Sequence, residues 1–196
     1  MKQVYSIRRA LLCLILAVLA FSFTACGEAT PEERLQEAQQ LMQERQLPLA
    51  ILRLKGLIEE EPDSEAAIDA RFLLANIYNR LGREENLKKA LEQARAVYEQ
   101  LGFQDQRGFA AFKLIVEAHL KLDQYDQALA QVTEAVDRAE EPQVKNNLRM
   151  MRTSLLLNSP TEEQVQEGIA FLRTTMLESE EVAVRHPLKR VTHHEH

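Results

Sequence analysis

Apolar residues recur along most of the chain at the spacing of an amphipathic helix, and helix-ending residues interrupt them at regular intervals. From residue 31 onward they return every three or four positions, which places them on one face of a helix. Ala, Leu, Glu, Gln and Arg dominate this region, and no strand-like alternation of useful length is present. The interruptions include Pro62, Gly82, Gly102, Pro142 and Pro160. The pattern predicts an all-α fold.

Several of the predicted helices carry capping residues at their ends. Thr30 precedes Pro31 and Glu33, which predicts an N-cap, a proline in the first turn and a capping box. Ser159 and Glu162 have the same spacing and predict a second capping box.

Other helix ends are predicted from single residues. Asp63 or Ser64 is expected to cap one helix, and a further helix is expected to begin near Asp105. Gly82 and Gly102 are expected to end helices, because glycine adopts the backbone conformations in which helices commonly stop.

Helix pairs return at roughly 34–40 residues, the signature of a helical solenoid. The first unit places Ala38, Leu41, Ala50, Leu54 and Pro62 at a spacing that resembles the tetratricopeptide repeat. The resemblance covers about residues 31–177 and implies a right-handed α-solenoid of about four tetratricopeptide-like helix pairs. A short helix near residues 180–185 is expected to cap the end. Another antiparallel helical bundle is the alternative.

The N-terminal segment has the layout of an export signal. Lys2, Arg8 and Arg9 make its start positive, and residues 10–23 carry no charge. This apolar run is shorter than the roughly 20 residues of a membrane-spanning helix, so we expect a secretory signal peptide. Twin-arginine export is a less favoured reading of the two arginines.

The end of that segment, Phe23-Thr24-Ala25-Cys26, resembles the lipobox of bacterial lipoproteins, with Phe23 where leucine is usual. The resemblance implies cleavage before Cys26 and lipid attachment to this cysteine. The alternatives are an ordinary secretory peptide or an uncleaved anchor. Cys13 would leave with the signal, so the mature chain would form no internal disulfide.

These features divide the chain into four predicted parts. Residues 1–25 form the lipoprotein signal peptide, and residues 26–30 form the lipidated cysteine with a short tether. Residues 31–185 form the tetratricopeptide-like domain, and residues 186–196 form a flexible tail that contains histidines.

The charge and motif content argue against several functions. The whole chain has a net charge of −6, and loss of the three signal cations leaves −9, which disfavours nucleic acid and anionic membrane surfaces as partners. No phosphate-binding loop, nucleophile elbow or CxxC pair is present. His119 is expected to be a core residue, and the C-terminal histidines are more consistent with a tail than with a metal site. We therefore expect a non-enzymatic protein without cofactor or metal.

A binding groove is the remaining candidate site. In tetratricopeptide arrays the first helix of each pair lines a concave face, and the resemblance places eight residues there. They are Phe72, Asn76, Asn79, Arg80, Lys113, Glu117, Lys121 and Arg149. The cations among them would form a positive strip able to hold a peptide carboxylate. The match to a carboxylate clamp is partial, because Phe72 stands where that clamp has lysine.

The two resemblances together imply a lipid-anchored scaffold of the cell envelope, expected at the periplasmic face of the outer membrane. Lipoproteins of this architecture include a component of the outer-membrane barrel assembly machinery and the pilotins of type IV pili. The sequence therefore predicts a protein or peptide partner at the envelope and attachment to the membrane through lipid. An adaptor for cell-wall enzymes or for an export system is the alternative, and a small-ligand-binding protein is a third.

Overall fold

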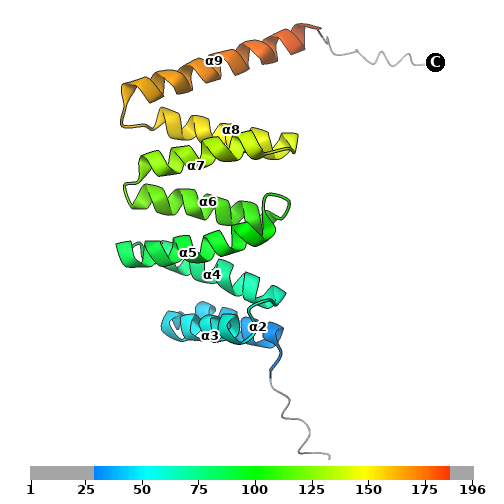
Figure 1. The fold of residues 1–196 in the computed structure, drawn as a ribbon, viewed down its shortest axis with the longest axis vertical. Helices are drawn as coiled ribbons and strands as arrows, with labels where there is room; N and C mark the ends of the chain where they lie inside the picture. Colours follow the sequence, from blue (N-terminus) through cyan, green and yellow to red (C-terminus); the bar gives the residue numbers. More distant parts are fainter. Residues whose placement is uncertain (1–28, 186–196) are drawn as a thin grey trace, which may run out of the picture. The chain divides into compact units, whose positions relative to one another are not determined.

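The computed structural model describes residues 29–185, and every regular element in this range is an α-helix. The helices are α2 (Pro31–Gln43), α3 (Leu47–Glu60), α4 (Glu65–Leu81), α5 (Glu84–Leu101), α6 (Gln106–Lys121), α7 (Tyr125–Arg138), α8 (Pro142–Leu157) and α9 (Glu162–Arg185). Figure 1 shows them joined by short connections. The predicted all-α fold is confirmed for the described range.

The chain divides into two compact units, the first ending at Ala70 and the second beginning at Arg71. In the first unit α2 packs against α3. In the second unit each helix from α5 to α8 packs against the next helix in the chain, and α6 to α9 follow one another as successive layers (Figure 1). Packing between sequence neighbours is the arrangement expected of helical repeats.

The capping box that begins α2 is present. The Thr30 hydroxyl accepts a hydrogen bond from the Glu33 amide at 3.2 Å, and the Glu33 carboxylate accepts one from the Thr30 amide at 2.9 Å. Pro31 occupies the first turn, where its missing N–H costs the helix nothing. The predicted start of this helix is therefore confirmed.

Two further caps follow the sequence expectation. Ser64 caps α4, because its hydroxyl accepts a hydrogen bond from the Ala67 amide at 3.1 Å. Asp105 caps α6 by accepting from the Arg107 amide at 2.7 Å. Each such cap typically contributes about 1 kcal/mol to helix stability.

Glycines end α4 and α5 as expected. Gly82 and Gly102 have φ values of 68° and 62°, a region that glycine enters without steric cost. Gly102 also has a close neighbour in the first turn of α6. A Cβ atom added to Gly108 would lie 2.0 Å from the Gly102 carbonyl oxygen, so only glycine fits at this crossing.

The start of α9 differs from the prediction, because the expected capping box between Ser159 and Glu162 does not form. The Ser159 hydroxyl instead accepts a hydrogen bond from the Thr161 amide at 3.0 Å and donates one to the Gln164 side chain. A serine hydroxyl that accepts from the amide two residues ahead forms a local turn, and it then does not cap the helix. The first backbone hydrogen bond of α9 is therefore the one that the Val165 amide donates to the Thr161 carbonyl.

The C-terminal helix also differs from the prediction. A separate short helix was expected near residues 180–185, but α9 continues through this segment without a break to Arg185. No glycine or proline lies between Gly168 and Pro187, so nothing in the local sequence ends the helix earlier.

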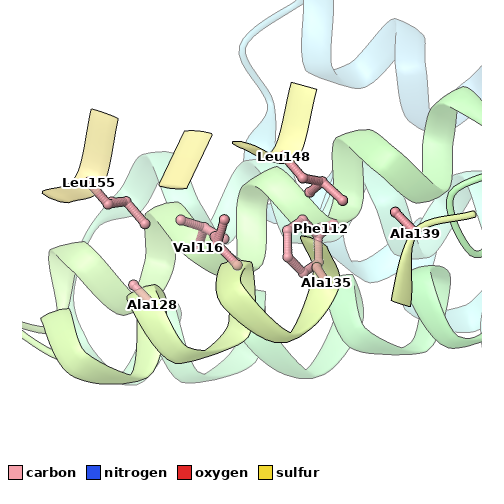
Figure 2. Close-up of a cluster of buried hydrophobic side chains, with 8 residues drawn as sticks. Phe112, Val116, Ala128, Ala135, Ala139, Leu148 and Leu155 are labelled. Carbon is pink, nitrogen blue, oxygen red and sulfur yellow. The ribbon is translucent and has the colours of Figure 1, made fainter. Parts of the chain in front are cut away.

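The best-defined apolar cluster lies where α8 packs on α6 and α7. Figure 2 shows Leu148 and Leu155 of α8 directed toward Phe112 and Val116 of α6. Small or β-branched residues of α7 complete the cluster: Ala128, Val132 and Ala135. Small residues on one helix let the next approach closely, and larger side chains fill the space that remains. The buried residues of α6 and α7 thus fall at the apolar spacing of an amphipathic helix.

None of the helices between residues 29 and 185 combines the length and the apolar character needed to cross a membrane. Cys26 and the rest of the predicted signal and tether up to residue 28 lie outside the described residues, as does the predicted histidine tail.

Candidate binding surface on helices α4 and α6

The eight residues of the predicted groove lie on three helices. Helix α4 carries Phe72, Asn76, Asn79 and Arg80, helix α6 carries Lys113, Glu117 and Lys121, and helix α8 carries Arg149. The structure joins α4 to α6 through polar contacts among these residues. It places Arg149 elsewhere, in a hollow between α8 and α9.

Lys121 forms the polar connection between α4 and α6. Its ammonium group donates hydrogen bonds to the backbone carbonyl of Asn79 at 3.0 Å and to the Asn79 side-chain oxygen at 3.3 Å. It also forms an ion pair with Glu117, one turn earlier on α6, at 2.8 Å. We call the group of Asn79, Glu117 and Lys121 the polar brace. It links positions 42 residues apart in the sequence.

The electrostatics of the brace follow from these contacts. The hydrogen bond from Lys121 is the main cause that lowers the pKa of the Glu117 carboxyl, and partial burial opposes it. The Asn79 amide and the nearby charges of Lys121 and Lys113 lower that pKa further. Glu117 is therefore held in its ionised form, and its negative charge offsets part of the positive charge on this face.

The asparagines of α4 are committed to internal contacts. Asn79 is buried, with 3 % of its surface exposed, and serves the brace. The side-chain amide of Asn76 donates to the Phe72 carbonyl at 2.8 Å, a bond within its own helix. In this conformation the Asn79 side chain is engaged by the brace, and a donor of the Asn76 amide is engaged within α4. Arg80 and Lys113, by contrast, are exposed to solvent.

His119 lies in the core, as the sequence predicted. It is 5 % exposed, and its Nδ1 lies 2.7 Å from the Gln124 side-chain oxygen while its Nε2 lies 3.3 Å from the Arg95 guanidinium. Because an amide oxygen only accepts and a guanidinium only donates, these partners fit the tautomer that carries its proton on Nδ1. His119 is thus satisfied within the fold and offers nothing to a substrate.

Among residues 29–175, whose side chains the structure describes, no group of three His, Cys, Asp or Glu side chains is placed to hold a metal ion. The C-terminal histidines, His186, His193, His194 and His196, lie outside the described residues.

Residues that the groove prediction did not include line the hollow beside Arg149. The hollow measures about 800 Å³ and is lined by Met150, Leu157 and Leu172 among others. The signal was available in the sequence, since Met150 and Leu157 are seven residues apart and so share a face of α8. They follow Leu148 and Leu155 by two positions, which turns them to the other side of the helix.

A comparison of the chain with protein-family models finds no match, and a comparison with curated proteins finds none either. The function is therefore inferred from the chain's own residues and their contacts.

Proposed function

We propose that the protein is a lipid-anchored, tetratricopeptide-like scaffold of the cell envelope that binds a protein or peptide partner across α4 and α6. The polar brace is the observation that carries the binding part of this proposal. It connects two helices that are separated along the chain by α5, with exposed cations on both. A surface preorganised in this way costs less conformational entropy to occupy.

The cations of this surface indicate the chemistry of the partner. Arg80 and Lys113 are exposed, and among the described residues no ion pair engages either side chain. Lys121 is held within the brace and offers less positive charge than the sequence suggested. An extended segment with a carboxylate, at its terminus or on a side chain, matches two such cations on neighbouring helices.

The membrane attachment in the proposal is supported by the sequence around Cys26. A positive start, a short apolar run and a cysteine after small residues form the pattern of a lipoprotein signal. Several acyl chains on one cysteine would hold the protein firmly at the bilayer, because each buried CH₂ contributes about 0.8 kcal/mol.

The partner class defines the role within the envelope. An outer-membrane barrel or pilus component as partner would make the protein an assembly factor at the periplasmic face of the outer membrane. Cell-wall enzymes or an export complex as partner would make it an adaptor that uses the same surface.

The tether is tested by Cys26→Ala. The variant is expected to leave the membrane fraction and to keep the far-ultraviolet circular dichroism of the wild type. Serine at the same position provides a second variant of similar size. Protein that still requires detergent for extraction after either change would rule out attachment through this cysteine.

The binding surface is tested by cross-linking in the native host, detergent solubilisation and identification of co-purifying proteins. The captured partner is then titrated against Lys113→Glu and Arg80→Glu. Both changes are expected to weaken binding by about tenfold, since each reverses a charge that would face a carboxylate. Lys55→Glu, an exposed lysine on α3, is the matched control because it changes net charge equally. Equal affinities for all three variants and the wild type would refute the proposed surface.

A further inference from the structure

Large apolar side chains are exposed to solvent in the hollow between α8 and α9. Met150 is 71 % exposed, and Leu157 and Leu172 are also exposed within the same lining. At about 800 Å³ the hollow is large enough to receive several side chains at once.

The preceding helix pair shows what such a hollow accommodates. In that pair α8 covers the face of α6 that carries Phe109, Phe112 and Val116. It does so with an apolar stripe along its own length, formed by Val144, Leu148, Met151 and Leu155. In this contact α8 packs against the pair formed by α6 and α7.

In the pair formed by α8 and α9, no helix of the described residues covers the corresponding positions. Moving 37 residues along the chain from Phe109, Phe112 and Val116 leads to Asn146, Arg149 and Thr153. All three line the hollow. The face is thus geometrically equivalent to an internal interface, but polar residues have replaced its largest apolar ones. Such a surface is suited to a helix that binds reversibly, because it tolerates exposure to water when empty.

We propose that this hollow is a second binding site, one that receives an amphipathic helix with acidic flanks from a partner protein. The apolar stripe of that helix would contact Met150, Leu157 and Leu172, as the stripe of α8 contacts the preceding pair. Its acidic residues would meet Arg149. Among the lining residues that the structure describes, this guanidinium is the only charged group.

The same charge pattern disfavours two other occupants. Two copies of the chain that meet through this hollow would bring their Arg149 guanidinium groups together, and the described lining residues supply no acid between them. Residues 186–196 supply Leu188 and Val191 as aliphatic side chains, and they add two cations, Lys189 and Arg190, against one acid, Glu195. A separate acidic helix is therefore the occupant that the lining favours.

The site is distinct from the α4–α6 surface and does not depend on it. A helix docked between α8 and α9 touches neither Arg80 nor Lys113. Charge reversal at Lys113 is expected to leave helix binding at the hollow unchanged, so failure of one proposal is distinguishable from failure of the other.

The test uses two fluorescein-labelled 16-residue peptides and purified full-length protein. The acidic peptide carries Val, Leu, Met and Leu at the spacing of the α8 stripe, with Glu, Gln and Ala elsewhere, and the basic peptide replaces each Glu by Lys. We expect fluorescence anisotropy to show saturable binding of the acidic peptide only. Met150→Asp is expected to weaken it by about tenfold or more, since an acid then lies in the apolar contact.

Leu52→Asp is the matched control, because Leu52 of α3 is 65 % exposed and lies outside the hollow. It is expected to bind like the wild type, and circular dichroism checks that each variant is folded. Arg149→Gln is expected to reduce the preference for the acidic peptide. Equal binding of both peptides, or equal binding by Met150→Asp, would overturn the proposal.

Two further results would also overturn it in favour of another occupant. Concentration-dependent dimerisation in sedimentation velocity that Met150→Asp abolishes would assign the hollow to a second copy. Peptide binding that appears only after removal of residues 186–196 would assign it to the protein's own C-terminal segment.

Discussion

Replacing Lys121 by methionine tests whether the polar brace holds α4 and α6 together. Methionine keeps most of the aliphatic length and removes the ammonium, which donates to both Asn79 oxygens and pairs with Glu117. Hydrogen bonds to charged groups typically contribute about 1.5–3 kcal/mol. Because the Lys121 side chain is 38 % exposed, solvent screening reduces the expected loss to about 1 kcal/mol.

The assay is urea denaturation followed by circular dichroism at 222 nm, with the free energy of unfolding extrapolated to water. Lys113→Met is the matched control, since Lys113 lies two turns earlier on the same helix, is exposed and makes no hydrogen bond to α4. It is expected to change stability by less than about 0.5 kcal/mol. If the two variants lose the same free energy, the brace contributes nothing to the connection between α4 and α6.

Three further predictions follow from the same structure. Leu148→Ala is expected to cost about 2–5 kcal/mol in urea denaturation, because this side chain is fully buried in the cluster beneath α8; a loss below about 1 kcal/mol would contradict that packing. Gly108→Ala is expected to lower the melting temperature more than Gly168→Ala, since its Cβ would lie 2.0 Å from a backbone oxygen and the other 3.0 Å from a leucine side chain; the reverse order would refute the close crossing. The lowered pKa of Glu117 means that its contribution to stability is present above the unfolded pKa near 4.5 and is lost as pH falls through the lower folded value. Stability measured from pH 6 to pH 3 should therefore fall less steeply in Lys121→Met than in the wild type, and parallel curves would contradict the assignment.

Much of the helical framework was predictable because its signals are local. Thr30 and Glu33 satisfy each other's amides within one turn, so their spacing alone defines the start of α2. Ser159 shows the limit of this reasoning. Its spacing to Glu162 fits a capping box, yet its hydroxyl bonds Thr161 and Gln164 instead, and the sequence pattern does not distinguish these geometries.

The candidate surface was only partly predictable. The resemblance to the tetratricopeptide repeat placed Asn79 and Lys121 on the same face, and the structure brings them into contact. The sequence did not show that Lys121 forms an ion pair with Glu117 or that Asn79 is buried. Those outcomes depend on the distance between two helices that are not adjacent in the chain.

The sequence by itself determined the all-helical fold and several helix ends, because apolar periodicity and capping act over four residues or fewer. Tertiary structure alone decided which faces of those helices are covered. Leu148 and Met150 lie two residues apart on α8, yet one is fully buried and the other is 71 % exposed. The physical reason is that burial requires a second surface, and α6 and α7 supply it on one side of α8 only.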